Sequence, residues 1–199
     1  MKNIAKLLVQ CKVINLNFVN KYKWSSGVIS PIYIDNRILF SKLKERDIIW
    51  NNIADLVKRH FPTATFISGI STASIGHAVA VSYLLNLKSG YVRPTQKIHG
   101  TRKNIEGEVS LDDQIVIIED VIATGLSTIQ TINIFENHGY KVLGVISIFN
   151  YLTHKSEKNL HDYKIHSLTN INEVVESALE ENKITQNDAV QLQIFLNTL

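Results

Sequence analysis

The sequence of 199 residues contains one cysteine, three prolines and no apolar stretch that approaches the length of a membrane-spanning helix. A single cysteine excludes an internal disulfide, and its place near Ile4 and Leu8 predicts that Cys11 packs in the core. A spanning helix needs about 20 consecutive apolar residues, so we expect no membrane partner. The N-terminal residues are too polar for a secretory signal, which favours a cytoplasmic protein.

Charge of either sign is also modest. Charged residues make up 20 % of the chain, with a net charge of +3 and a pI of about 8.9. The lysines and arginines are scattered, and few aromatic residues lie among them, so no nucleic-acid partner is expected. The small basic excess favours anionic small molecules as ligands.

The order of apolar segments predicts a single α/β domain over residues 1–199. Helical and extended segments alternate from residue 66 onward, which is typical of a central parallel sheet flanked by helices. An earlier helix and two extended segments predict a small N-terminal cap over residues 1–40. Helices are expected at residues 3–11, 48–60, 75–85, 127–138, 171–181 and 186–197, and extended segments at 13–19, 32–38, 66–69, 89–92, 114–118, 141–149 and 164–168.

Residues 116–128, VIIEDVIATGLST, predict an anion-binding site. An aliphatic strand leads into the acids Glu119 and Asp120, and Gly125 permits a sharp turn before a helix. Backbone N–H groups from Thr124 to Thr128 can bind a phosphate at such a helix start. The acid pair adds partners for hydroxyl groups or a divalent metal, so a phosphorylated sugar fits. The alternative is a buried strand followed by a helix that Ser127 or Thr128 caps.

Residues 91–107, YVRPTQKIHGTRKNIEG, form a second unusual segment. This long polar connection contains Arg93, Lys97 and His99, and long connections of this kind are often lids over active sites. Taken alone, a solvated basic loop is an equally good interpretation. Because Arg93, Gly69 and Glu119 follow predicted parallel strands, all three are expected at the carboxyl edge of the sheet, where ligands bind. His77, on the helix after Gly69, is interpreted as structural.

The motif at Glu119 resembles the phosphoribosyl-pyrophosphate (PRPP) motif of the type I phosphoribosyltransferases. Three further segments narrow the resemblance to the orotate-using members of that family. They are the loop with Arg93, Lys97 and His99, the segment SGVISPIYIDNR at residues 26–37, and GISTASIGHA at residues 69–78. All four occur in the family's order, within roughly residues 25–130.

This resemblance implies transfer of ribose 5-phosphate from PRPP to orotate, giving orotidine 5-monophosphate and pyrophosphate. It also implies Mg²⁺ as cofactor, with no protein side chain assigned as its ligand, and a homodimer in which the loop of one subunit reaches its neighbour's site. Lys97, His99, Arg93 and Asp120 would be the catalytic residues. The implied substrate-binding residues are Tyr33, Ile34, Ser71, Thr72, Ala73, Arg93, Lys97, His99, Glu119, Asp120, Val121, Ile122, Ala123, Thr124, Gly125, Leu126, Ser127 and Thr128.

The chain departs from the family pattern at several cationic positions. Ser25, Pro94 and Thr95 stand where the family commonly has lysine, and the arginine that some members carry near Asn150 is missing. Two lost charged hydrogen bonds would cost about 3–6 kcal/mol if nothing replaced them. Lys21, Lys23 and Arg102 are candidates to compensate. A phosphoribosyltransferase for another base and a non-catalytic PRPP-binding regulator therefore remain as alternatives.

Overall fold

The computed structural model describes residues 4–24, 27–93 and 104–199. Its centre is a six-stranded sheet in the order β10-β9-β8-β5-β6-β7, parallel except for the last pair. This confirms the predicted α/β class. The strands are β5 (Phe66–Ile70), β6 (Lys88–Val92), β7 (Ile105–Glu106), β8 (Gln114–Ile122), β9 (Lys141–Asn150) and β10 (Ile165–Asn170).

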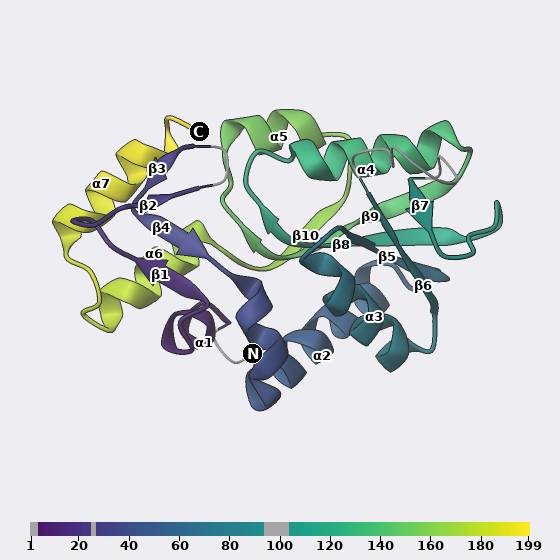
Figure 1. The fold of residues 1–199 in the computed structure, drawn as a ribbon, viewed down its shortest axis with the longest axis horizontal. Coiled ribbons are helices and arrows are strands. Elements are labelled where there is room, and N and C mark those ends of the chain that lie inside the picture. The colour runs from purple at the N-terminus through teal and green to yellow at the C-terminus, as the bar shows by residue number, and fades with distance from the viewer. Residues whose placement is uncertain (1–3, 25–26, 94–103) are drawn as a thin grey trace.

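Helices cover both faces of the sheet (Figure 1). Alternate side chains of β8 separate the core into two layers, because successive residues of a strand point to opposite faces. Val116 and Ile118 lie in the core layer under α2 and α3, whereas Ile115 and Ile117 lie in the layer under α4 and α5. These helices are α2 (Leu43–His60), α3 (Ser74–Leu85), α4 (Leu126–Asn137) and α5 (His154–Leu160).

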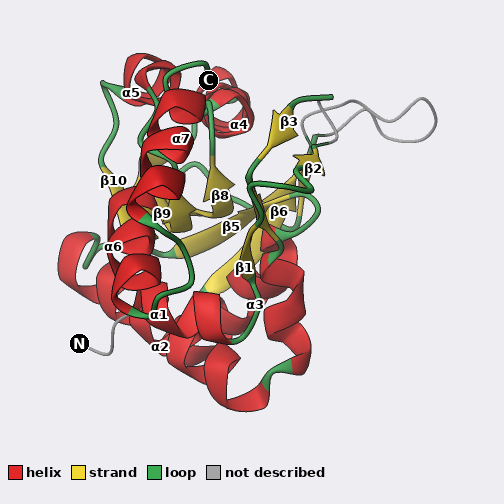
Figure 2. Cartoon of the chain, turned by 90° about the vertical axis from the view of Figure 1, so that its left-hand side faces the viewer, coloured by secondary structure: helices red, strands yellow, loops and turns green. Residues whose placement is uncertain are grey.

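The N-terminal cap is built from two small antiparallel pairs. β1 pairs with β4 and β2 pairs with β3, and Figure 1 shows both pairs beside the main sheet. Figure 2 shows α1, α6 and α7 together on the same side of the molecule. The elements are α1 (Ile4–Gln10), β1 (Ile14–Leu16), β2 (Tyr22–Lys23), β3 (Ile29–Ser30), β4 (Ile32–Ile34), α6 (Ile171–Glu180) and α7 (Gln186–Leu196).

The C-terminal helix supports the cap. Leu192 and Leu196 are buried, and the Phe195 ring meets the Trp24 ring of the cap edge-on, with 5.9 Å between centroids. Thr185 and Asp188 form the capping box that the sequence indicates at the start of α7. Cys11 is a half-buried free thiol packed against the same core, as predicted.

Several predicted boundaries are wrong. The extended segment expected at 32–38 ends at Ile34, because Asp35 caps a 3₁₀ helix, Asn36–Ser41. The helix α2 begins at Leu43 rather than at residue 48. The connection 91–107 is not wholly irregular, since β7 pairs antiparallel with β6. Within the described ranges no helix is long and apolar enough to cross a membrane.

Candidate active site

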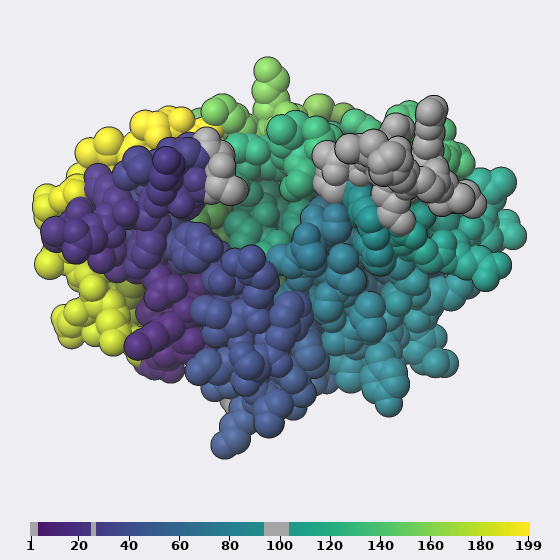
Figure 3. Space-filling model, in the orientation of Figure 1, coloured from purple at the N-terminus to yellow at the C-terminus, as the bar shows by residue number. Residues whose placement is uncertain are grey.

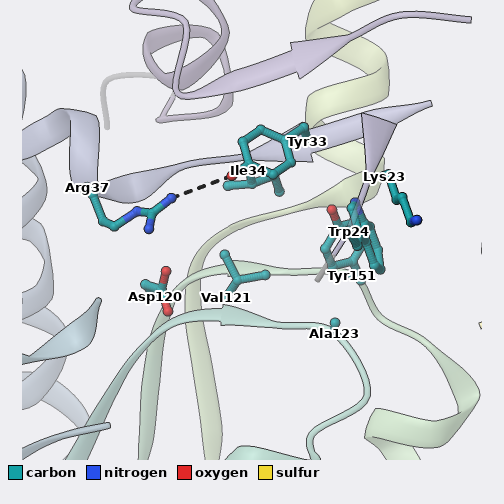
Figure 4. A pocket seen from close by; sticks show the side chains of 9 residues that line it. All are labelled: Lys23, Trp24, Tyr33, Ile34, Arg37, Asp120, Val121, Ala123 and Tyr151. Atoms are coloured by element: carbon teal, nitrogen blue, oxygen red, sulfur yellow. Dashed lines mark hydrogen bonds between the residues drawn. The ribbon is translucent and has the colours of Figure 1, made fainter. Parts of the chain in front are cut away.

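A pocket of about 420 Å³ lies between the cap and the carboxyl end of β8. Figure 3 shows the surface hollowed between the purple N-terminal segment and the green middle of the chain. In Figure 4 the cap forms one wall and the end of β8 forms the opposite wall. The pocket is lined by Lys23, Trp24, Tyr33, Ile34, Arg37, Asp120, Val121, Ala123 and Tyr151.

The cap wall carries two residues predicted from the sequence and one that was missed. Tyr33 and Ile34 come from β4, and the Tyr33 ring lies 5.6 Å from that of Tyr22. Arg37, which was not predicted, is held by Asp35 through Nε–Oδ1 and Nη2–Oδ2 contacts of 2.7 and 3.0 Å. This Arg37 contact lowers the pKa of Asp35. A two-point grip of this kind fixes the guanidinium beside the pocket.

The end of the pocket farther from Arg37 is lined by Trp24 and Tyr151, which sequence reasoning also missed. Their rings lie 5.5 Å apart, and Trp24 Nε1 donates a 3.0 Å hydrogen bond to the Ile32 carbonyl. Burial raises the pKa of Tyr151, so its phenol keeps its proton. Tyr151 directly follows β9, a position that could have been predicted from the rule that loops after parallel strands line the ligand site.

The two adjacent acids have different surroundings. Asp120 faces the pocket, whereas Glu119 is only 4 % exposed. Three hydroxyl groups approach the Glu119 carboxylate: Oγ of Ser74 at 2.9 Å, Oγ of Ser127 at 3.1 Å and Oγ1 of Thr128 at 3.5 Å. Glu119 thus ties the start of α3 to the start of α4.

Burial and the neighbouring Asp120 raise the pKa of Glu119 well above its usual value, although the hydrogen bond from Ser74 opposes the shift. The carboxyl group of Glu119 therefore holds a proton more readily than an exposed glutamate does. Asp120 is anchored separately, because its backbone N–H donates to Ser74 Oγ at 2.9 Å and its carbonyl accepts from Asn36 Nδ2 at 3.0 Å. These contacts position the Asp120 side chain at the pocket.

The segment Thr124–Thr128 forms a turn into α4, as predicted. Gly125 has φ of +74° and occupies the N-cap position. The alternative interpretation, in which Ser127 or Thr128 caps the helix, is wrong, because Gly125 is the N-cap residue and both hydroxyls bond to Glu119. The first N–H groups of a helix have no partner within the helix, so this end can receive an anion.

Two side chains, one from the N-cap of α5 and one from within α5, hold this turn in place. Thr153 Oγ1 donates to the Ala123 carbonyl at 2.6 Å, and Asn159 Nδ2 donates to the Thr124 carbonyl at 2.8 Å. The strand before the turn is longer than predicted, since β8 continues to Ile122 and pairs there with β9. The residues Glu119–Ile122 therefore belong to the C-terminal end of strand β8 and not to the loop that follows it.

The loop Ser71–Ala73 connects β5 to α3 at the same carboxyl edge. Its start is held by a 3.0 Å hydrogen bond from the Ser71 N–H to the Val92 carbonyl. The close approach of strand and helix requires glycine at position 69, because a Cβ there would lie 2.9 Å from the backbone of Ile75. Ser74, directly after the loop, bonds to Glu119, so the loop and the acid pair are linked.

Arg93 stands where β6 ends and the basic segment begins. Its backbone pairs with Asn104 through Arg93 N–H to Asn104 carbonyl at 2.9 Å and Asn104 Nδ2 to Arg93 carbonyl at 3.1 Å. The Arg93 guanidinium contacts Tyr91 Oη at 3.0 Å and Glu106 Oε1 at 3.5 Å. Lys97 and His99, together with Ser25, Pro94, Thr95 and Arg102, lie outside the described residues.

His77 has a structural environment, as interpreted from the sequence. It is fully buried, accepts a 2.9 Å hydrogen bond from Trp50 Nε1 at Nδ1, and stacks on Phe40 with centroids 4.7 Å apart. Burial lowers the pKa of His77 to about 4, so the ring is neutral. It stabilises the packing of α2 on α3.

Comparisons with known proteins agree with this architecture. Residues 40–182 match the family model of the phosphoribosyl transferase domain. The chain is 39 % identical over 189 residues to the orotate phosphoribosyltransferase of Staphylococcus haemolyticus, with 94 % of each chain covered. It is 37 % identical over 194 residues to that of Listeria innocua, covering 96 % of this chain and 93 % of the relative. The structure of orotate phosphoribosyltransferase from Aeropyrum pernix has a similar fold, with a TM-score of 0.74 at 24 % identity, covering 87 % of this chain and 96 % of that one.

Proposed function

The chain belongs to the orotate phosphoribosyltransferase family, and from this membership we propose that it transfers the 5-phosphoribosyl group of PRPP to orotate. In this reaction N1 of orotate loses its proton to solvent and forms a bond to C1 of the ribose, while the bond from C1 to the pyrophosphate oxygen breaks. The products are orotidine 5-monophosphate and pyrophosphate, a step in pyrimidine synthesis. The observation that carries the proposal is the pocket between the cap and the end of β8, which Asp120 and Ala123 line and which the turn at Gly125 directly follows in the chain.

The reaction creates charge in two places. The ribose becomes positively charged as the bond to pyrophosphate breaks, and negative charge grows on the leaving group. In our proposal the Asp120 carboxylate accepts hydrogen bonds from the ribose hydroxyls, and the N–H groups of residues 124–128 bind the 5-phosphate. Direct contact between Glu119 and the ribose stays a prediction. In the structure the Glu119 carboxylate already accepts hydrogen bonds from three protein hydroxyl groups.

The base would lie between the two walls of the pocket. Tyr33 and Ile34 line the cap side, while Val121 and Ala123 line the sheet side. This slot suits a flat ring because its opposing walls limit the thickness of the ligand. The cap also removes water from the reacting carbon, which strengthens the electrostatic stabilisation of charge there.

The pyrophosphate would be bound on the other side of the ribose, by the loop Ser71–Ala73 and by cations. Arg93 is at the carboxyl edge, where its guanidinium also contacts Glu106. We propose that Lys97 and His99 stabilise the charge on the departing pyrophosphate and that His99 donates a proton to it.

Mg²⁺ is proposed as the cofactor. When bound with PRPP it neutralises charge on the phosphates and favours departure of pyrophosphate. Hard oxygen donors suit Mg²⁺, and Asp120 supplies such oxygens at the pocket. In the described ranges no group of three or more His, Cys, Asp or Glu side chains is placed to hold a metal ion. Substrate oxygens and water would therefore complete the coordination.

A homodimer is proposed as well. On α3 Val79 and Tyr83, four residues apart and therefore on one face of the helix, are 51 % and 85 % exposed, and the adjacent Leu84 is 43 % exposed. Grouped apolar exposure of this kind marks interaction surfaces. We propose that a second copy of the chain covers this face, which lies on a helix that begins at the pyrophosphate loop. The cytoplasmic location stays a prediction.

The proposed activity is tested by incubating the purified protein with PRPP, Mg²⁺ and a panel of purine and pyrimidine bases. Consumption of orotate with stoichiometric pyrophosphate release is expected. Turnover of another base in place of orotate would support the alternative base specificity. PRPP binding without turnover of any base would instead support a regulator.

The basic loop is tested with Lys97→Ala. Loss of a cation that stabilises the leaving group should lower kcat by on the order of a hundredfold, whereas the melting temperature should stay the same. Steady-state kinetics and thermal melting measure both. Unchanged turnover would remove Lys97 from the mechanism.

A further inference from the structure

Lys23 and Arg37 are the two cationic side chains of the described chain that line the pocket. Their electrostatic situations differ. Arg37 is engaged with Asp35 by two hydrogen bonds and with the Tyr33 hydroxyl at 3.5 Å. Within residues 4–24, 27–93 and 104–199, no carboxylate is paired with Lys23. Of these two described cations, Lys23 is therefore the one whose charge no protein carboxylate balances, so it is available to an anionic group of a ligand.

Lys23 is also well placed along the pocket. It lies on β2 next to Trp24, at the end of the pocket lined by Trp24 and Tyr151, whereas Asp120 and Arg37 lie at the other end (Figure 4). Apart from Lys23, the surroundings at this end are uncharged, because Trp24 carries no charge and Tyr151 keeps its proton. A cation with neutral neighbours favours an anionic group on the ligand more than a neutral one.

Orotate differs from uracil by a carboxylate on the carbon next to N1. We propose that Lys23 binds this carboxylate and thereby selects orotate over neutral pyrimidines. The proposal rests on the proposed function and adds the residue that reads the base. It also gives this end of the pocket a cation although Ser25 stands where the family commonly has lysine.

Two nucleotides that differ only in the carboxylate test the proposal. Dissociation constants of orotidine 5-monophosphate and uridine 5-monophosphate are measured by calorimetry for the wild type, Lys23→Met, Lys23→Arg and Arg37→Met. Lys21→Met is the matched control, because Lys21 lies two residues earlier and is not among the lining residues. Thermal melting of each variant shows that folding is intact.

The expected result is that Lys23→Met lowers the preference for orotidine 5-monophosphate by about tenfold, the size of one partly exposed charged hydrogen bond. The affinity for uridine 5-monophosphate and the KM for PRPP should not change. Lys23→Arg should restore most of the preference, and Lys21→Met should keep it.

Three results would overturn the proposal: an unchanged preference in Lys23→Met, an equal loss in Lys21→Met, or a loss in Arg37→Met alone. The activity of the wild-type protein with orotate and PRPP distinguishes a failure of this proposal from a failure of the proposed function. If it converts orotate with PRPP while Lys23→Met keeps the preference, only the role of Lys23 is wrong. If the wild type converts no orotate, the proposed function is wrong.

Discussion

Asp113 is a buried carboxylate at the end of β8 opposite to the pocket. Its oxygens accept hydrogen bonds from Lys88 Nζ at 2.7 Å, from Thr65 Oγ1 at 2.9 Å, and from the N–H and hydroxyl of Ser110 at 2.8 and 2.9 Å. Burial alone would raise the pKa of Asp113, but these donors outweigh it and hold the pKa well below the usual range. The charged form of Asp113 therefore joins the starts of β6 and β8.

We predict that Asp113→Asn destabilises the fold by about 2–3 kcal/mol, because Lys88 loses its partner and an amide cannot accept all four hydrogen bonds. The sign of the pH dependence follows from the lowered pKa. The contribution of Asp113 is present above the ordinary aspartate pKa of about 3.9 and is lost as the pH falls below it. Chemical denaturation at pH 7 and at pH 3 measures both effects.

Asp112→Asn is the matched control, since Asp112 is an exposed neighbour. It should change stability by less than about 0.5 kcal/mol. In Asp113→Asn the difference in stability between the two pH values should shrink. If the stability of Asp113→Asn differs between pH 7 and pH 3 as much as that of the wild type, the loss of stability in acid comes from other carboxylates.

At the residue scale, sequence patterns identified several residues of the site but not the side chains that surround them. The acid pair, the glycine turn and Tyr33 were predicted at the site, and the structure brings Tyr33, Ile34, Asp120, Val121 and Ala123 to one pocket. The sequence could not show that Glu119 turns to the hydroxyls of α3 and α4, because Ser74 is 45 positions away in the chain. Trp24 and Tyr151 were missed for the same reason, since their contact depends on how the cap lies over β9.

At the element scale, the turn into α4 depends on one glycine. A Cβ on Gly125 would lie 2.9 Å from Leu160 Cδ1, and the φ of +74° disfavours any residue with a side chain. We predict that Gly125→Ala costs about 1–3 kcal/mol of stability and raises the KM for PRPP by at least about tenfold, because the phosphate-binding N–H groups move. Thermal melting and steady-state kinetics measure the two effects.

Gly139→Ala provides the comparison for backbone strain. Gly139 has φ of +81°, and a Cβ there meets only Leu111 Cδ2, at 3.5 Å. It should cost about 1 kcal/mol and leave the KM for PRPP unchanged, because it follows α4 at the end remote from the turn. Equal changes in KM for both variants would show that loss of stability, and not loop geometry, weakens PRPP binding.

Elements with strong apolar patterns were predicted well, and short or polar ones were not. The start of α2, KLKERDI at residues 42–48, is mostly polar, and Lys42 provides no side-chain cap, so the pattern gave no signal there. The strand β7 has two residues and depends on its pairing with β6, which is not a local property. The extended segment expected at 32–38 followed the apolar residues up to Ile38, but the cap by Asp35 begins a 3₁₀ helix at Asn36.

At the scale of the whole molecule, the exposed face of α3 predicts the oligomeric state. Tyr83→Glu places a charge in the proposed interface, where an unpaired charge is costly. We expect sedimentation velocity to show a monomer for this variant and a dimer for the wild type. Val190→Glu, on the exposed side of α7, is the control, since Val190 is also an exposed apolar residue at 57 %.

The control should remain a dimer. If Tyr83→Glu also remains a dimer, or if the wild type is a monomer, the proposed interface on α3 is wrong. Because the basic loop is expected to act across the interface, a monomeric Tyr83→Glu should also lose turnover.

The edge-on contact between Phe195 and Trp24 gives the last turn of the chain an influence on the base pocket. Displacement of Phe195, for example by a bulky fusion after Leu199, would remove one of the contacts that hold the indole, the others being the Ile32 carbonyl and the Tyr151 ring. Orotate should then bind more weakly while PRPP affinity is retained, and Phe195→Ala should reproduce this in initial-rate measurements. Weak orotate binding by a protein tagged after Leu199 would therefore reflect the displaced Phe195 and not the residues that line the pocket.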